Sequence, residues 1–196
     1  MLNSADVHAY NNTFFNARVS FERNDRVAAG DTFDWHATTG PALDQREGHV
    51  FLHNLMAASD SHHDPLFEVL QKSTLCGKLV HPQLTEVDGN VYLRAASTDS
   101  GAPAPLIVYA PSEGENCTSR LASLDDFRKL QPAFEKSGVE IDRSPRSVLK
   151  GPDRGNFELQ RALSNAPARN YLPAEVRSLL GWNESQAMTP GAYPLR

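Results

Sequence analysis

An asparagine beside a short apolar run recurs three times in the first half of this chain, and this recurrence limits the folds that are open to it. The asparagines are Asn12, Asn54 and Asn90, each just before or inside a run of β-branched, aromatic or aliphatic residues. Successive asparagines lie roughly 40 residues apart with unequal steps, a spacing that fits structural repeats of variable length. Runs of alternating apolar residues predict further strands between them, at 17–23, 65–71 and 105–110.

A solenoid of stacked parallel strands explains this pattern. An asparagine at a bend can bond the backbone of the neighbouring repeat, and it tolerates the left-handed conformation that tight bends need. Side chains that point inward would form apolar columns, which we expect to contain Phe14, Val50, Leu52, Val91 and Leu93. The alternative is an unrelated β-sandwich, but sandwiches favour strands at intervals of about 8–12 residues, which do not describe this chain.

The second half of the chain predicts two short helices. Segment 123–138 begins like a helix, with Ser123 as its N-cap and apolar residues three apart on one face. A second helix is predicted at 173–181, where Pro173 suits the first turn and Gly181 the stop. The closing MTPGAYPLR contains two prolines and a glycine and is expected to be irregular.

Six motifs follow one another in a family-like order: DGNVYLR (88–94), LIVYA (106–110), SLDDFRKL (123–130), NFELQ (156–160), LPAEVRSLLGW (172–182) and PGAYPL (190–195). This order resembles the C-terminal part of carbohydrate-active, right-handed parallel β-helix proteins of the pectate-lyase-like superfamily. The resemblance implies an all-β class, a partial solenoid with short C-terminal helices. It implies β-helix coils over 1–122, with polar loop insertions at 24–48 and 57–64, and a closing segment over 123–196.

Charge and cysteine content disfavour several classes of partner and cofactor. The net charge is −5 and the basic residues are scattered singly, so no basic stripe exists to follow a nucleic acid. No stretch approaches the roughly 20 apolar residues that span a membrane. Cys76 and Cys117 fit no zinc motif and are expected to be free thiols, with a single disulfide as the alternative for an exported protein.

The expected location is extracellular or periplasmic, which the resemblance alone implies, because polysaccharides are met outside the cytoplasm. The first residues, MLNSADVHAYNN, lack the basic and apolar regions of a signal peptide. A first coil that begins mid-stack would expose its apolar cross-section around 7–15. We therefore expect a second copy of the chain, missing sequence or the tail (183–196) to cover it.

The first insertion supplies the candidate catalytic residues. Glycoside hydrolysis needs two carboxyl groups on opposite sides of the scissile bond. The catalytic candidates are Asp34 with Asp31 or Asp44, and the substrate-binding candidates beside them are Trp35, His36 and Arg46. An indole ring can pack on the apolar face of a pyranose, although the same residues also suit an ordinary solvated loop.

The second insertion contains a cluster of histidine and aspartate, Asp60, His62, His63 and Asp64. Such side chains bind zinc and similar ions, but adjacent histidines rarely bind one ion together, so no metal and no cofactor is expected. His62 and His63 are instead candidates for sugar contacts.

Three functions stay open, all with a polysaccharide or oligosaccharide as the partner. The first is a glycoside hydrolase, and the second is a non-catalytic module that binds glycan or closes the solenoid. The third is a polysaccharide lyase, which would use arginines near the first loop to neutralise a uronate, with Arg18, Arg23, Arg26 and Arg46 available.

Overall fold

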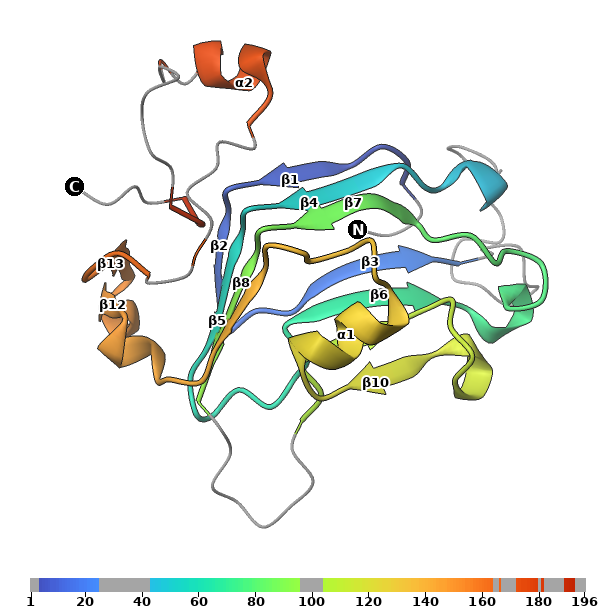
Figure 1. The fold of residues 1–196 in the computed structure, drawn as a ribbon, viewed down its shortest axis with the longest axis horizontal. Coiled ribbons are helices and arrows are strands. Elements are labelled where there is room, and N and C mark those ends of the chain that lie inside the picture. Colours follow the sequence, from blue (N-terminus) through green and yellow to red (C-terminus); the bar gives the residue numbers. More distant parts are fainter. Residues whose placement is uncertain are drawn as a thin grey trace, which may run out of the picture.

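The computed structural model describes residues 4–24, 43–95, 104–163, 166, 172–179, 181 and 189–192. Most of its strands belong to three sheets that surround a common core (Figure 1). Sheet B contains β1 (His8–Tyr10), β4 (His49–Leu52) and β7 (Leu84–Asp88). Sheet C contains β2 (Thr13–Phe15), β5 (Leu55–Ala58), β8 (Val91–Arg94) and β11 (Val139–Ile141). Sheet A contains β3 (Val19–Arg23), β6 (Phe67–Gln71), β9 (Ile107–Tyr109) and β10 (Ser119–Leu121).

The first nine strands repeat in groups of three. Strands β1–β3, β4–β6 and β7–β9 visit sheets B, C and A in that order, and each of β1–β6 pairs in parallel with the strand three places later. We call these groups the first, second and third units. The strands predicted at 8–16, 49–57 and 86–94 are confirmed, and their parallel pairing excludes a sandwich of antiparallel sheets.

Beyond the third unit the chain leaves this pattern. β11 continues sheet C in parallel, but β10 pairs antiparallel with β9, and β12 (Leu149–Gly151) pairs antiparallel with β13 (Asn156–Leu159). The described α-helices are α1 (Leu124–Leu130) and α2 (Ala174–Leu179). Short 3-10 turns occupy Leu43–Gln45, Ser73–Leu75, Glu115–Cys117, Pro145–Ser147 and Pro152–Arg154.

This mixture corrects the predicted fold class. The expected all-β, right-handed parallel β-helix with short C-terminal helices is wrong, because the described residues combine several parallel sheets with two antiparallel pairings and two short helices. The physical reason lies after β9. There a capped helix and two antiparallel pairings take the place of a complete fourth unit, and β11 alone continues in parallel.

A row of carboxamides joins the units at the corner between sheets B and C. Asn54 Oδ1 accepts hydrogen bonds from the backbone N–H and Nδ2 of Asn12 at 2.9 and 3.0 Å. Asn90 Oδ1 accepts from the same two groups of Asn54 at 2.8 and 3.0 Å. The row ends on Glu135, whose Oε1 accepts from Asn90 Nδ2 at 2.7 Å. The predicted role of asparagine at the bends is confirmed, and we call these four residues the amide ladder.

The left-handed backbone at these corners belongs to the residue before each asparagine. Asn11, His53 and Gly89 have φ values of 52°, 58° and 65°. A glycine and an asparagine adopt this conformation at low cost, whereas a histidine does so less often. The chain therefore turns from sheet B into sheet C one residue earlier than the sequence predicted.

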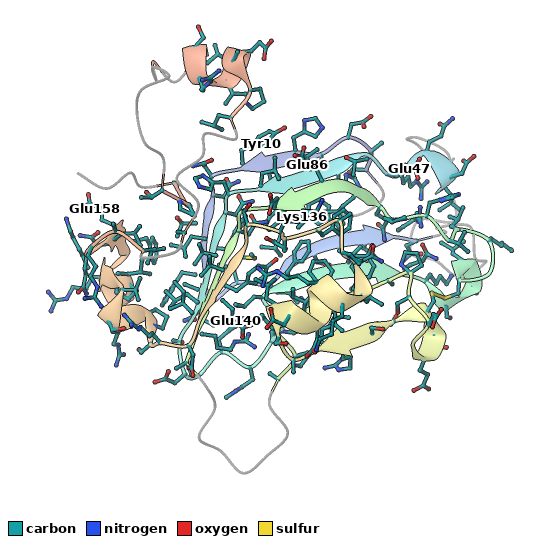
Figure 2. All side chains as sticks on the ribbon, in the orientation of Figure 1. Tyr10, Glu47, Glu86, Lys136, Glu140 and Glu158 are labelled. Carbon is teal, nitrogen blue, oxygen red and sulfur yellow. A yellow bond between two sulfur atoms is a disulfide. The ribbon has the colours of Figure 1, made fainter. Side chains whose placement is uncertain are left out.

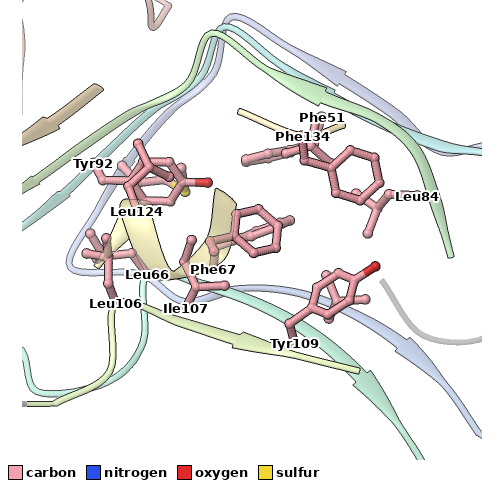
Figure 3. Packing of buried hydrophobic residues seen from close by; sticks show 14 of the residues in the cluster. Phe51, Leu66, Phe67, Leu84, Tyr92, Leu106, Ile107, Tyr109, Leu124 and Phe134 are labelled. Carbon is pink, nitrogen blue, oxygen red and sulfur yellow. The ribbon is translucent and has the colours of Figure 1, made fainter. Parts of the chain in front are cut away.

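Apolar side chains fill the space between the sheets, and α1 closes that space beside the third unit (Figures 1 and 3). The rings of Phe51 and Phe67 stack with centroids 4.9 Å apart, and Phe21 meets both edge-on. From α1, the Phe127 ring lies 5.4 Å from that of Tyr109. Each such ring that is removed from water stabilises the fold by roughly 1.5–3 kcal/mol.

The predicted inward column is correct only at Phe14, which packs against this main core. Val91 and Leu93 lie on the opposite face of β8, in a second cluster that includes apolar residues of β12 and β13. Val50 and Leu52 are buried but belong to neither cluster. The prediction failed because these strands are apolar at nearly every position, so no alternation shows which face is inward.

Both predicted helices are confirmed. Ser123 Oγ accepts a hydrogen bond from the Asp126 N–H at 3.1 Å, and Glu140 Oε2 accepts one from the Leu124 N–H at 2.8 Å. These bonds satisfy amide donors that the first turn of a helix leaves without partners. Gly181, with φ of 66°, follows α2 as expected.

A disulfide joins Cys76 and Cys117, whose Cα atoms are 5.6 Å apart. It ties the turn after β6 to the turn after β9, and so connects the second and third units. The expectation of two free thiols is therefore wrong, and the alternative of a single bridge is correct. The sequence could not show this, because only the parallel pairing of β6 with β9 brings the two turns together.

We expect Asn54→Ala to lower the free energy of unfolding by about 2–4 kcal/mol, because it leaves buried donors and acceptors on both neighbouring ladder residues without partners. Urea denaturation followed by circular dichroism measures the change. The control is Lys78→Ala, at an exposed residue. Equal stability of the two variants would contradict a supporting role for the ladder.

Candidate functional site

A polar pocket of about 290 Å³ lies beside sheet C, between the corner that follows β5 and the turns that flank β12. Its walls come from three separate parts of the chain. The lining residues are Phe15 and Asn16, Ser59, Asp60 and Ser61, Ser144, Pro145 and Arg146, and Pro152 and Asp153. We call it the corner pocket.

Hydrogen bonds fix the wall formed by the corner after β5. Asn16 Oδ1 accepts from the Ser59 N–H at 2.7 Å, and the hydroxyl oxygens of Ser59 and Ser61 lie 3.1 Å apart. Asn16 itself is left-handed, with φ of 48°, and its N–H donates to the Ala57 carbonyl at 2.9 Å. These contacts between the first and second units therefore position hydroxyl and amide groups toward the pocket.

An arginine–carboxylate pair forms the opposite wall. Arg146 Nε and Nη2 donate to the two carboxylate oxygens of Asp153 at 2.8 and 3.4 Å. The hydrogen bond that Arg146 donates to Asp153 raises the pKa of Arg146, and the nearby charge of Asp60 adds to this effect. Both members are more than half exposed, so the pair contributes little to stability and its polar edges stay accessible.

The charge of the corner pocket is slightly negative, because two carboxylates, Asp60 and Asp153, face one guanidinium, Arg146. Serine hydroxyls and an asparagine add neutral donors and acceptors, while Phe15 and two prolines add apolar surface. Pockets of this composition suit small polar ligands that also have an apolar face.

Most candidates from the first insertion cannot be placed. Asp31, Asp34, Trp35 and His36 lie outside the described residues. Asp44 is exposed in the 3-10 turn Leu43–Gln45 and lines neither the corner pocket nor the other pockets described below.

The arginines considered for a lyase are engaged with the protein itself. Arg46 is buried and donates to the Asn24 carbonyl at 2.8 Å. Arg23 is 1% exposed, bonds Gln71, and donates to the His81 carbonyl at 3.0 Å. Arg18 pairs with Glu68 at 3.1 Å, and Arg26 lies outside the described residues.

The predicted histidines lie next to the corner pocket along the chain but do not line it. His62 is half-buried, which lowers its pKa, and the charge of Arg94 lowers it further. Its Nε2 is buried without a hydrogen-bond partner, and His63 is exposed. Of the predicted cluster, Asp60 alone reaches the pocket. Over the part of the chain that the structure describes, no group of three potential metal ligands occurs.

Two further hollows are lined by described residues. One of about 250 Å³ lies along β11 and is closed by residues 161–163 and 166. The other, of about 560 Å³, lies between β1 and α2 and is largely apolar. There the rings of Tyr10 and His8 pack edge to face, with their centroids 5.9 Å apart. The hollow along β11 also brings together two carboxylates, Glu140 and Asp142, and two arginines, Arg143 and Arg161, but it lacks the serine hydroxyls and the asparagine of the corner pocket.

Among the described residues two carboxyl groups have raised pKa values, and both were missed by sequence reasoning. Glu68 on the outer face of sheet A is 6% exposed; burial raises its pKa, which the charge of Arg18 opposes. Glu135 is completely buried, and burial raises its pKa to about 7, although hydrogen bonds from Asn90 and Tyr92 oppose the shift. Neither residue lines a described pocket, so neither is positioned to meet a ligand.

The surroundings of Glu135 are those of a structural group. Tyr92 Oη donates to its Oε1 at 2.7 Å, and Arg128 Nε donates to its backbone carbonyl at 2.8 Å. A Cβ at Gly138 would lie 2.1 Å from Glu135 Oε2, so residue 138 must lack a side chain. The spacing of the ladder residues could have pointed to Glu135, because successive members lie 42, 36 and 45 residues apart. The search for asparagines missed it because this fourth member is a glutamate.

Comparison with known proteins assigns no family to this chain. No protein-family model, no curated protein and no solved structure matches it. No helix in the described ranges is long and apolar enough to cross a membrane. The resemblance to the pectate-lyase-like superfamily stays a prediction, so a functional proposal depends on the site itself.

Glu135 makes the stability of the fold depend on pH. In the folded protein, Glu135 keeps its proton until the pH approaches its raised pKa of about 7. In the unfolded chain, the same carboxyl group releases its proton near its ordinary pKa of about 4.5. Stability from this group is therefore fully present below pH 4.5 and declines as pH rises to 7, by on the order of 3 kcal/mol. We expect Glu135→Gln to remove this decline in urea denaturation between pH 4.5 and 7.5.

The control for the pH experiment is Glu86→Gln, at an exposed carboxyl on β7 (Figure 2). It should keep the same pH dependence as the unmodified protein. A Glu135→Gln variant whose stability falls with pH as steeply as that of the control would contradict the role of the buried carboxyl.

Proposed function

We propose that this chain binds a polysaccharide or oligosaccharide in the corner pocket. The observation that carries the proposal is the lining itself, where hydroxyl, amide, carboxylate and guanidinium groups surround a small apolar patch. A sugar ring has equatorial hydroxyls that both donate and accept, and it has an apolar face. Carboxylates and arginine provide strong, charge-assisted hydrogen bonds to hydroxyls, and Phe15 with Pro145 and Pro152 offers apolar contact.

The composition of the pocket favours neutral sugars over uronates. Asp60 and Asp153 repel a sugar carboxylate, and the one cation, Arg146, is already paired with Asp153. A lyase needs a free cation or arginine beside the uronate. The arginines that the structure describes near the first loop are occupied by protein groups, so the lyase is the weakest of the three functions.

Glycoside hydrolysis is the second candidate, because Asp60 and Asp153 line one pocket. A hydrolase needs one of its carboxyl groups to stay protonated at neutral pH, which usually requires burial. Both of these carboxylates are exposed, and Asp153 is paired with an arginine. Binding without hydrolysis is therefore the function that the pocket supports best.

We expect Asp60→Ala to weaken glycan binding tenfold or more, about 1.4 kcal/mol, because Asp60 is the carboxylate that is not held by Arg146. Isothermal titration calorimetry with neutral hexose and pentose oligosaccharides measures the dissociation constant. The control is Glu113→Ala, at an exposed residue outside the pocket.

The same titration mixtures, assayed for new reducing ends, distinguish binding from hydrolysis. Release of reducing ends that Asp153→Asn abolishes would favour the hydrolase. The proposal fails if the unmodified chain binds none of these oligosaccharides, or if Asp60→Ala binds them as tightly as Glu113→Ala does.

We also propose an extracellular or periplasmic location, which the Cys76–Cys117 disulfide supports. Disulfides persist in oxidising compartments and are rare in the cytosol of most organisms. Polysaccharides are found in the same compartments, so the disulfide and the proposed ligand point to the same location.

We expect protein isolated without reductant to take up no iodoacetamide under denaturing conditions, and to take up two equivalents after reduction, as read by intact mass. Reduction should lower the free energy of unfolding by roughly 4 kcal/mol, because the bond closes a long loop. Two alkylated thiols before reduction would contradict the proposed location. A Cys76→Ser, Cys117→Ser double variant serves as the control for non-specific effects of the reductant.

A further inference from the structure

The amide ladder has a direction, and one of its ends is open. Each carboxamide oxygen in the row accepts two hydrogen bonds from the asparagine of the unit before it, one from the backbone N–H and one from Nδ2. Asn12 is the first member. Its Nδ2 donates to the Tyr10 carbonyl and to Asn54, but its Oδ1 accepts no hydrogen bond from any residue that the structure describes.

The backbone beside the ladder repeats the same asymmetry. The amides of Leu55, Val91 and Val139 donate to the carbonyls of Asn12, Asn54 and Asn90, respectively. Thr13 holds the position in the first unit that Leu55 holds in the second, and β2 is paired in the described structure with β5 alone. The open end therefore offers one side-chain acceptor, Asn12 Oδ1, next to one backbone donor, the Thr13 N–H.

Strand edges and apolar side chains surround this open pair. β1, β2 and β3 are edge strands of the three sheets, and all three belong to the first unit. Of the core-facing residues in and beside these strands, Val7, Ala9, Phe14 and Val19 are only partly buried, although Phe21 is buried. The core-facing residues of the second unit are all buried. A parallel strand placed here would extend the same hydrogen-bond pattern and cover these side chains.

The described part of the tail faces this position without filling it, because Leu172, Pro173 and Val176 lie across a hollow of about 560 Å³ that Asn12 also lines. Ala192 N–H donates to Thr13 Oγ1, and Gly191 N–H donates to the His53 carbonyl. Asn11 Nδ2 donates to the Thr189 carbonyl. These contacts lie at the corner of the first two units and use neither Asn12 Oδ1 nor the Thr13 N–H.

A second copy of the chain does not fit the open end either. In a two-fold arrangement Asn12 Oδ1 would face its own equivalent, acceptor against acceptor, and the edge strands would meet antiparallel. In a head-to-tail arrangement the other end of the ladder would have to supply donors. That end is the Glu135 carboxyl group, its backbone N–H already donates to the Val87 carbonyl, and α1 covers the adjacent core.

We propose that the open end of the ladder binds an extended polypeptide segment that runs parallel to β1 and β2 and places an asparagine over Asn12. The asparagine supplies its backbone N–H and Nδ2 to Asn12 Oδ1, and its carbonyl accepts from the Thr13 N–H. This interaction replaces the self-association expected at the first coil. The contacts of this asparagine are independent of glycan binding, because neither Asn12 nor Thr13 lines the corner pocket.

The test uses a synthetic peptide with the sequence of residues 84–94, LTEVDGNVYLR, which contains the turn and asparagine of the third unit. The matched control is the same peptide with Asn90→Leu, which has a similar shape but lacks the Nδ2 donor. Titration into the full chain is followed by two-dimensional amide NMR. We expect saturable shifts at the Thr13 amide and at the Asn12 side-chain amide, and binding at least tenfold weaker for the control peptide.

Three results would overturn the proposal. The first is no saturable shift up to millimolar peptide, and the second is equal affinity for the two peptides. The third is a stable dimer of the free chain in analytical ultracentrifugation that the peptide does not dissociate, which would make a second copy the occupant. Varying the peptide rather than the protein keeps each result free of effects on folding.

Discussion

Hydrogen bonds between stacked carboxamides are the interaction on which the rest of this structure depends. Asn12, Asn54 and Asn90 lie where the chain leaves sheet B for sheet C, and each bonds the next at both its backbone and its side chain. A buried amide without partners costs more free energy than a satisfied one contributes, so these bonds fix the register between units as well as holding them together. The apolar core, the paired strands and the corner pocket all follow from that register.

The last member of the amide ladder, Glu135, has a carboxyl group, whereas the other three members have carboxamides. Asn90 needs an acceptor for its N–H and Nδ2, and a carboxyl group provides one without requiring a further unit. The same segment continues from α1, which covers the core, so one stretch of chain terminates both the hydrogen-bond row and the apolar interior. The opposite end has no comparable group among the described residues, and this difference gives the stack its polarity.

The strands and corners of the three units could be predicted from the sequence. The segments that close the stack after the third unit could not. The asparagine positions, the strands beside them and the N-cap at Ser123 could be read locally, because each depends on residues near in sequence. The inward faces of β4 and β8 could not, since Val50, Val91 and their neighbours are apolar on both sides. The antiparallel pairings and the Cys76–Cys117 bond depend on contacts between distant segments, and this dependence led to the wrong fold class and to the wrong expectation of free thiols.

The candidate site was likewise predictable only where its residues are close together in the sequence. Asp60 was singled out from its sequence neighbours, but Arg146 and Asp153, which complete the pocket, come from a segment that carries no recognisable motif. Their relation to Asp60 arises only because the turns that flank β12 lie against sheet C. The histidines beside Asp60 attracted attention as metal ligands or sugar contacts, whereas the structure leaves them outside the pocket.

The disulfide has a mechanical consequence. β7, β8 and β9 all lie between Cys76 and Cys117, so the whole third unit is enclosed in a covalent ring. If tension pulls on the two ends of the chain, the enclosed residues cannot be drawn out, even when every hydrogen bond in the ring has broken. The stretched length is then shorter by roughly 140 Å than that of the reduced chain, and the part of the molecule beside α1 is shielded from the load.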